Sequence, residues 1–220
     1  MKRLISDNQN LLNQNLHKSD NNFGNRPTAG GLARKLDLAI LKLHKDGCCD
    51  KFLDYGTGKG LLVDWLRKTL PKQMEINGYD PAVPEFASPH VPKSDIVTCL
   101  DVLEHVEPDK INSVLCELQS LTKYLCFCTI DLQPSVRELN DGRNAHILLA
   151  PPEWWITRFS QIFDCIVSFP IFHISGHKQK IVILAANKSS HMPKAISFME
   201  TLDIYNGRAK GGYLKAPNQT

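Results

Sequence analysis

The chain has 220 residues, which is enough for one domain with its own core and short for two. Its formal net charge of +3 gives no electrostatic footprint of nucleic-acid binding. Apolar runs such as residues 181–186 are far too short to span a bilayer. No apolar segment follows the basic residues Lys2 and Arg3, so the sequence shows no secretory signal and no membrane partner is expected.

The seven cysteines lie mostly within apolar stretches, as small buried side chains do in a reduced compartment. We therefore expect a cytoplasmic protein. Neither the adjacent pair Cys48 and Cys49 nor the alternating pair Cys126 and Cys128 has the C-x-x-C spacing of zinc sites. The sequence predicts no metal site.

The first segment, residues 1–31, is rich in asparagine and other polar residues. We expect a mobile arm, because little apolar surface is available to offset the entropy of ordering it. The alternative is a lid that closes over a ligand, with Phe23, Asn25 and Arg26 near its hinge. Apolar residues then recur at helical spacing and predict a helix over residues 31–46.

The next segment, residues 52–60, reads as the end of a buried strand, a glycine-rich turn and the start of a helix. Glycines let the backbone approach a ligand where no Cβ intrudes. Asp54 stands before the glycines, and Asp80 ends the following strand-like run, residues 75–80. Two acids around such a turn suit a ligand with a cationic amino group at one end and a ribose diol at the other. S-adenosylmethionine is such a ligand.

Two alternatives accompany this interpretation. A dinucleotide such as NAD also takes an acid about 20 residues after a glycine turn. That fingerprint requires its third glycine at the position occupied by Leu61, and it has no acid two places before the first glycine. The second alternative is an ordinary tight connection between strand and helix. We rank the nucleoside-sulfonium ligand first and the ordinary turn last.

The remaining elements follow in alternation. Prolines crowd residues 81–93, so we expect a reduced third strand there or none. The patterns then predict a strand at 95–100, a helix at 107–122, a strand at 124–130 and a helix starting near 152. Residues 165–173 and 180–186 look like a closing hairpin. A polar C-terminal extension, residues 188–220, carries one short helix.

Three ordered motifs carry a resemblance to a known family. They are Asp54-x-Gly56-x-Gly58-x-Gly60, then Asp80, then the segment 95–106 with Asp101-x-Leu103-Glu104-His105. Together they resemble class I S-adenosylmethionine-dependent methyltransferases, in particular the subgroup with D-x-L-E-H after the fourth strand. The resemblance covers about residues 50–106.

The resemblance implies a Rossmann-like α/β fold for residues 32–187. The open twisted sheet would be mostly parallel with an antiparallel last strand and helices on both faces. The cofactor would be S-adenosylmethionine, with contacts implied from Asp54, Tyr55, Gly56, Thr57, Gly58, Asp80, Pro81, Leu100 and Asp101. Asp80 would accept the ribose hydroxyls. Asp101 would lie near the sulfonium.

The acceptor side is less defined in the sequence. His146 is our candidate general base, because the neutral pKa range of histidine suits proton abstraction. Arg143 is a candidate to bind an acidic group of the substrate, and Trp154 to wall its pocket. For all three, a purely structural role is the alternative. We read His105 as structural or adjacent to the cofactor.

The predicted function is methyl transfer from S-adenosylmethionine to a small molecule or sugar by in-line displacement. A nucleic-acid methyltransferase is the second interpretation. The sequence lacks the Asn-Pro-Pro-Tyr and Asp-Pro-Pro-Tyr tetrapeptides and the Pro-Cys nucleophile of base-methylating enzymes, which argues against it. A non-catalytic S-adenosylmethionine-binding module is third, and an NAD-linked oxidoreductase is last. The sequence predicts no oligomeric state.

Overall fold

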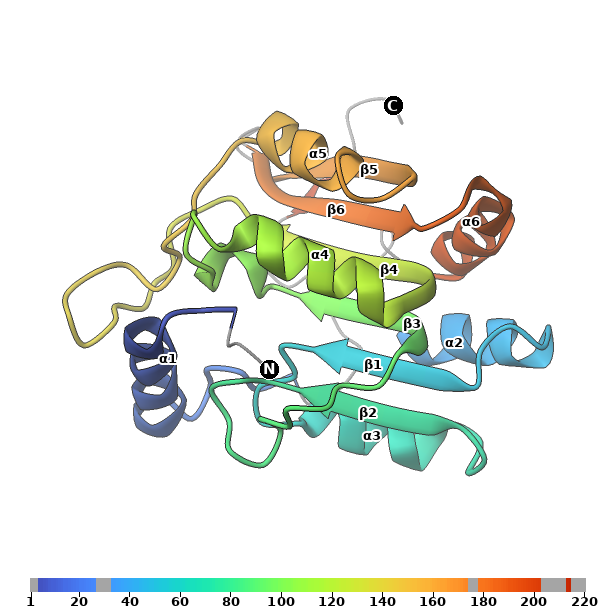
Figure 1. Ribbon diagram of the computed structural model, residues 1–220, viewed down its shortest axis with the longest axis horizontal. Coiled ribbons are helices and arrows are strands. Elements are labelled where there is room, and N and C mark those ends of the chain that lie inside the picture. Colours follow the sequence, from blue (N-terminus) through green and yellow to red (C-terminus); the bar gives the residue numbers. More distant parts are fainter. Residues whose placement is uncertain (1–3, 27–32, 174–177, 203–212, 215–220) are drawn as a thin grey trace.

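The computed structural model describes residues 4–26, 33–173, 178–202 and 213–214. These residues form one sheet with the strand order β2-β1-β3-β4-β6-β5-β7, flanked by helices (Figure 1). The strands are β1 (Lys51–Tyr55), β2 (Glu75–Tyr79), β3 (Ser94–Leu100), β4 (Thr122–Asp131), β5 (Cys165–His173), β6 (Lys178–Ala186) and β7 (Tyr213–Leu214). The α-helices are α1 (Asp7–Ser19), α2 (Leu36–Lys45), α3 (Leu61–Thr69), α4 (Ile111–Leu121), α5 (Pro152–Ser160) and α6 (Met192–Thr201).

The direction of the strands follows the prediction. β1 pairs in parallel with β2 and β3, and β3 pairs in parallel with β4. β6 runs antiparallel to both β4 and β5, which closes the sheet as a hairpin. Every residue of β3 is buried, as expected of a central strand covered on both faces. The predicted Rossmann-like fold is therefore confirmed.

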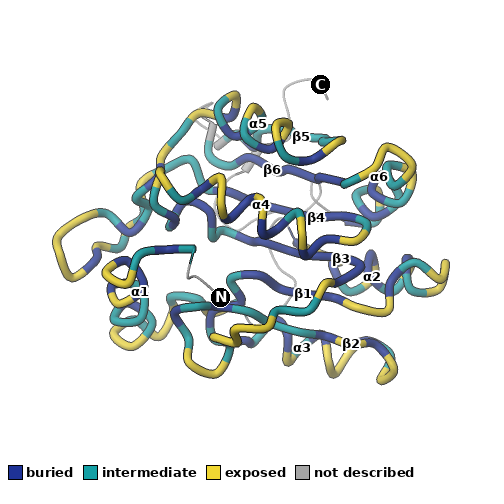
Figure 2. Tube along the Cα trace, viewed as in Figure 1, coloured by how far each residue is buried: buried dark blue, intermediate teal, exposed yellow. Residues whose placement is uncertain are grey.

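The sheet separates two apolar cores, and its central strands β1, β3, β4 and β6 are mostly buried (Figure 2). Helices α2, α3 and α6 cover one face, packing on side chains such as Phe52 and Phe127. Helices α4 and α5 cover the other face, where Trp155 and Phe159 are fully buried. Among the described residues, none of these helices combines the length and apolar character needed to cross a bilayer.

The third strand expected in a full-length sheet is missing from the described chain. Residues 81–93 contain turns and bends but no strand, so β2 is the edge of the sheet. Proline cannot donate to a strand ladder, and four prolines interrupt this segment. The structure thus agrees with the predicted reduction of this strand.

The N-terminal segment packs on the domain through α1. The Oγ of Ser6 caps the helix by accepting the backbone N–H of Gln9 at 3.1 Å. Leu12 and Leu16 are buried in a small cluster with Leu139 and Ala145. The prediction of a mobile arm assumed too little apolar surface, and this assumption does not hold for α1. Residues 1–3 and 27–32 lie outside the described part.

The C-terminal boundary predicted at residue 187 does not separate the cores. Ala195 and Phe198 of α6 are fully buried in the same cluster as α2. A short 3-10 helix, η3 (Ser189–His191), leads into α6. The predicted short helix therefore belongs to the packed domain. Residues 203–212 and 215–220 lie outside the described chain.

Candidate active site

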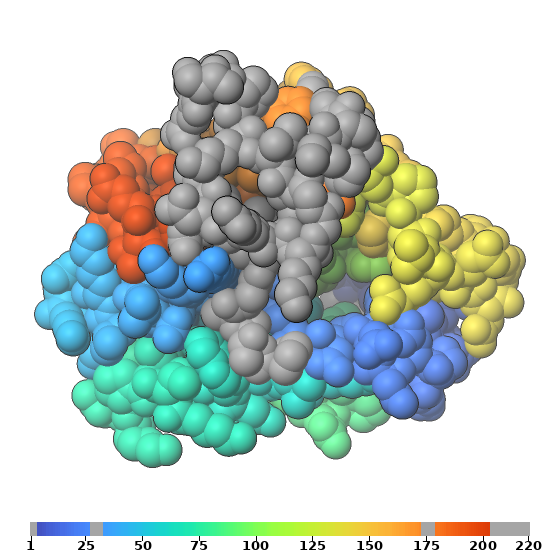
Figure 3. All heavy atoms as spheres, turned by 180° about the vertical axis from the view of Figure 1, so that it is seen from behind, coloured from blue at the N-terminus to red at the C-terminus, as the bar shows by residue number. Residues whose placement is uncertain are grey.

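One large cavity opens where the parallel strands end. It has a volume of about 700 Å³ and is lined by the glycine turn, the ends of β2 and β3, residues 22–26 and residues 133–137. Helix α1 and the loop after β4 lie side by side at this end of the molecule, in blue and yellow (Figure 3). Open α/β sheets bind ligands beyond the carboxyl ends of their strands.

The glycine turn is held by contacts within the protein. The N–H groups of Gly56 and Thr57 both donate to the carbonyl of Tyr79, at 2.7 and 3.0 Å. Gly56 has φ +77°, and a Cβ there would lie 2.4 Å from Cγ2 of Val102. A Cβ on Gly58 would lie 2.4 Å from the carbonyl oxygen of Gly24. The glycines thus allow close packing around the turn, and these N–H groups are engaged by the protein itself.

Asp80 is buried and holds the turn from the end of β2. Its Oδ2 accepts the N–H of Gly58 and its Oδ1 accepts the N–H of Ala82, both at 2.9 Å. Burial raises the pKa of Asp80, and burial also lowers the pKa of the nearby His17. Each carboxylate oxygen has a further lone pair, so Asp80 retains the capacity to accept ligand hydroxyls.

Asp54 is buried at the end of β1. Its Oδ1 accepts the hydroxyl of Thr98 at 2.8 Å, which links β1 to β3 beneath the cavity. Burial raises the pKa of Asp54. The residue therefore joins β1 to β3 and lines the cavity.

Asp101 follows β3 in the left-handed region, with φ +57°. Non-glycine residues in this region are strained and cluster at functional sites. Its Oδ1 meets Nζ of Lys180 at 2.9 Å, and its Oδ2 meets Arg26 at 2.9 Å. Burial raises the pKa of Asp101, but the Lys180 ammonium and the Arg26 guanidinium outweigh it and hold that pKa well below its usual range. Asp101 is thus a carboxylate paired with two cations, Lys180 and Arg26.

Glu104 enters the same cavity from the 3-10 helix η2 (Leu103–His105). The residue is fully buried, and its Oε1 accepts the N–H of Asp131 at 3.0 Å. Its Oε2 has no hydrogen-bond partner in the described chain. Burial, followed by the charge of Asp101, raises the pKa of Glu104 to about 8.

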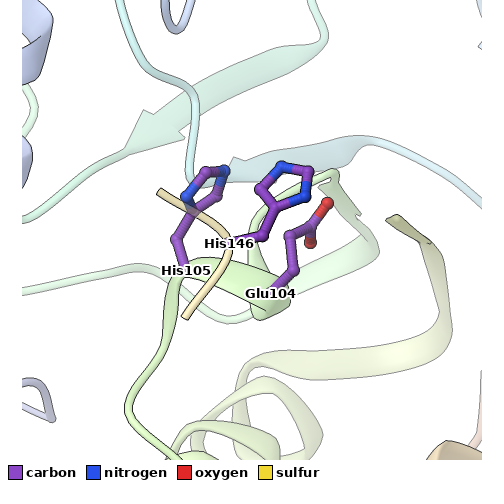
Figure 4. A group of neighbouring side chains, drawn as sticks. All are labelled: Glu104, His105 and His146. Atoms are coloured by element: carbon purple, nitrogen blue, oxygen red, sulfur yellow. The ribbon is translucent and has the colours of Figure 1, made fainter. Parts of the chain in front are cut away.

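Two histidines face each other beside Glu104 (Figure 4). The rings of His105 and His146 meet edge to face, with centroids 4.9 Å apart. Nδ1 of His105 binds the carbonyl of Ala145 at 2.7 Å, and Nδ1 of His146 binds the carbonyl of Gln133 at 2.6 Å. A carbonyl only accepts, so each Nδ1 carries the proton and each Nε2 keeps a lone pair. Burial, and then His146, lower the pKa of His105 to about 4.

The N-terminal segment closes this cavity from the outside. Nζ of Lys59 donates to the carbonyls of Asp20 and Asn21, at 3.0 and 2.9 Å. The Phe23 ring lies between the rings of His17 and His105, with centroid distances of 4.6 and 5.4 Å. The segment therefore packs on the glycine turn and lines the cavity from His17 to His105.

Comparison with known proteins places this arrangement in a family. A family model described as a methyltransferase domain matches residues 25–163, more than half of the chain. The chain belongs to this family. The resemblance to class I methyltransferases is thereby confirmed, and with it the predicted enzyme class and its cofactor S-adenosylmethionine. The assignment to the D-x-L-E-H subgroup stays a prediction.

Several solved structures resemble this chain at low sequence identity. The mitomycin 7-O-methyltransferase MmcR is 13% identical with a TM-score of 0.46, over 70% of this chain and 53% of that one. A methyltransferase from Archaeoglobus fulgidus is 14% identical with a TM-score of 0.46, over 68% of this chain and 93% of that one. The magnesium protoporphyrin IX methyltransferase from Synechocystis, with bound S-adenosylhomocysteine, is 14% identical with a TM-score of 0.46, over 70% of this chain and 81% of that one. The chain thus spans about half the length of the first of these structures. A search of curated protein sequences finds no match.

The cavity brings the predicted cofactor residues together. It is lined by Asp54, Tyr55, Gly56, Thr57, Gly58, Asp80, Pro81, Leu100 and Asp101, and by His146 as the candidate base. Their contacts with a bound cofactor stay predictions. Their convergence agrees with a single site for cofactor and acceptor.

The two predicted substrate residues lie elsewhere in the structure. Neither Arg143 nor Trp154 is among the described residues that line the cavity. Arg143 forms an ion pair with Asp141, with 2.7 Å between Nη2 and Oδ2, and it also donates a hydrogen bond to Gln9. Its charge is thus balanced within the same loop. Trp154 packs edge to face on Trp155 and carries the Arg158 guanidinium on its ring at 4.9 Å. The geometry gives no support to either assignment.

Several cavity residues had no such assignment from the sequence. His17 and Phe23 come from the segment predicted to be mobile, and Lys180 comes from β6. Glu104 and His105 were part of the recognised motif, but no ligand role followed from it. Their position just after a strand, where ligands bind in open α/β sheets, was the one feature of the sequence that could have suggested a ligand role for them.

Proposed function

We propose that the protein transfers the methyl group of S-adenosylmethionine to a hydroxyl of a small molecule or sugar bound in the same cavity. The observation that carries this proposal is the continuity of the cavity, which joins Asp80 and the glycine turn to His146. A volume of about 700 Å³ lies within the usual range of small-molecule sites.

The fit to the cofactor can be judged from the polar groups present. Asp80 has acceptor capacity for the ribose hydroxyls beside its two backbone contacts. Nδ1 of His17 and Oε1 of Gln179 are buried, line the cavity and have no hydrogen-bond partner in the described chain. Buried polar groups are costly without partners, so these atoms favour a bound polar ligand.

The chemistry requires alignment and removal of one proton. As the acceptor oxygen forms its bond to the methyl carbon, the bond from that carbon to sulfur breaks and its electron pair passes to sulfur. The acceptor proton passes to Nε2 of His146. This nitrogen keeps its lone pair because Nδ1 carries the ring proton and donates it to the Gln133 carbonyl. The carbonyl of Gln133 also fixes the orientation of the ring.

We expect the change His146→Asn to stop transfer and to leave the cofactor site intact. Asparagine can still donate to the Gln133 carbonyl, but it has no basic nitrogen in place of Nε2. The transfer rate should fall by roughly 100-fold or more. The affinity for S-adenosylhomocysteine should stay within about twofold of the unmodified protein, since the change leaves the glycine turn untouched.

The measurement uses methyl-labelled S-adenosylmethionine with a panel of sugars and hydroxylated metabolites, and RNA and DNA oligonucleotides in parallel. His90→Asn is the matched control, because His90 is exposed and does not line the cavity. Label that enters only the oligonucleotides would overturn the proposed substrate class. Unchanged turnover by His146→Asn would remove His146 from the reaction.

A further inference from the structure

Three side chains of the cavity form a cluster with the chemistry of a metal site. Glu104 and His105 come from η2, and His146 comes from the loop after β4 (Figure 4). One ligand atom from each lies within 4.8 Å of the others. The cluster lines the cavity together with the glycine turn.

The orientation of both imidazoles fits metal binding. Each Nδ1 is held by a backbone carbonyl, Ala145 for His105 and Gln133 for His146. This contact fixes the proton on Nδ1 and leaves the lone pair of Nε2 for a metal ion. Metal-binding histidines usually donate their other ring N–H to a protein oxygen in the same way. Each ring is thus held by a separate carbonyl, with Nε2 left as the nitrogen that can bind a metal.

The carboxyl of Glu104 adds an independent observation. The residue is fully buried, and its Oε2 has no hydrogen-bond partner in the described chain, although Oε1 is bound by Asp131. A buried oxygen without a partner is costly and needs an explanation. A cation bound by Oε2 would satisfy it.

We propose that Glu104, His105 and His146 bind one divalent first-row transition-metal ion, with the remaining coordination positions open to the cavity. Two imidazoles and one carboxylate suit manganese, iron, cobalt, nickel or zinc. With bonds of about 2.1 Å, adjacent ligand atoms are about 3.4 Å apart around a tetrahedral ion and about 3.0 Å apart around an octahedral one. The present separations of up to 4.8 Å require the side chains to close by small rotations on binding.

This inference rests on the proposed methyl transfer, narrows the class of acceptor and changes one step, the removal of the acceptor proton. The open positions of the ion would take an oxygen of the methyl acceptor, so the acceptor would be a hydroxyl compound that binds metal. Nε2 of His146 cannot bind the ion and accept a proton at the same time. With the ion bound, His146 would be a ligand, and the ion would lower the pKa of a coordinated acceptor hydroxyl. The proton of that hydroxyl would then pass to water in the open cavity, and the methyl bond would form as proposed above.

The test is metal binding by the purified full chain without a polyhistidine tag. After treatment with EDTA and its removal, the protein is titrated with Mn²⁺ and followed by calorimetry and by electron paramagnetic resonance. Manganese is chosen because the exposed Cys116 thiol competes poorly for it. We expect one ion per chain. Glu104→Gln and His146→Asn should each weaken binding by at least about tenfold, whereas His90→Asn should bind as the unmodified protein does.

Titration with S-adenosylhomocysteine on the same samples separates the two proposals. Retained cofactor binding in all variants shows that the fold and the cofactor site are intact. The metal site is overturned if the unmodified protein binds no stoichiometric Mn²⁺, or if Glu104→Gln and His146→Asn bind Mn²⁺ as tightly as the unmodified protein. The methyltransferase proposal stands in either case. Metal binding without cofactor binding would instead reject the proposed function.

Discussion

Replacing Asp80 by alanine should weaken binding of S-adenosylhomocysteine by roughly 100-fold or more. Asp80 is the acid at the end of β2, and it anchors Gly58 and Ala82 through their N–H groups. Alanine removes the acceptor for the ribose hydroxyls and frees the turn at once. Two hydrogen bonds from the ribose hydroxyls to the Asp80 carboxylate would contribute about 3 kcal/mol or more to binding, which corresponds to the expected loss of affinity.

Calorimetric titration measures this loss, and circular dichroism verifies that the variant is folded. Asp80→Asn keeps one acceptor oxygen and the shape of the side chain, so we expect an intermediate affinity. Asp64→Ala is the control, because Asp64 is exposed on α3 and absent from the cavity lining. Unaltered affinity in Asp80→Ala would place the ribose elsewhere.

Replacing Glu104 by glutamine should stabilise the metal-free protein, and more so at pH 8.5 than at pH 5.5. The folded protein raises the pKa of Glu104 from 4.5 to about 8, because the side chain is buried near Asp101. A carboxyl with a raised folded pKa loses stability as the pH rises from its unfolded pKa to its folded pKa. Glutamine keeps an acceptor for the Asp131 N–H and does not titrate, so it escapes this loss.

Each pH unit in that window corresponds to about 1.4 kcal/mol, so the gain should differ by about 1 to 3 kcal/mol between the two pH values. Urea unfolding of both proteins in EDTA at each pH measures it. Glu85→Gln, which removes an exposed carboxylate outside the cavity, is the control and should show no such difference. An equal gain at both pH values would mean that Glu104 ionises freely in the folded protein.

The glycine turn and its two acids could be recognised from the sequence because their role depends on local geometry. A residue with positive φ favours glycine wherever the chain adopts it, and Gly56 and Gly58 both do. The apolar patterns were similarly local, and they predicted the strands and helices that build the sheet. The closing hairpin followed from two apolar runs around one glycine.

The acceptor side could not be predicted in this way. Arg143 and His146 are three residues apart in one loop, and the sequence assigned both to the acceptor side. The structure orients His146 through Gln133 and turns Arg143 to Asp141 at the surface. Side-chain direction in an aperiodic loop depends on hydrogen bonds to the loop itself and to its neighbours, and no periodic pattern encodes it.

The sequence by itself determined the family motifs, the order of strands and helices that form the sheet, the reduction of the third strand and the acids beside the glycine turn. Each of these depends on short-range spacing and backbone geometry. Only the tertiary structure decided that α1 packs beside the cavity through Leu12 and Leu16, and that Glu104 and His105 meet His146. These contacts join residues far apart in the chain. They arise from packing of the whole fold, where burial and long-range hydrogen bonds select one arrangement among many that are locally acceptable.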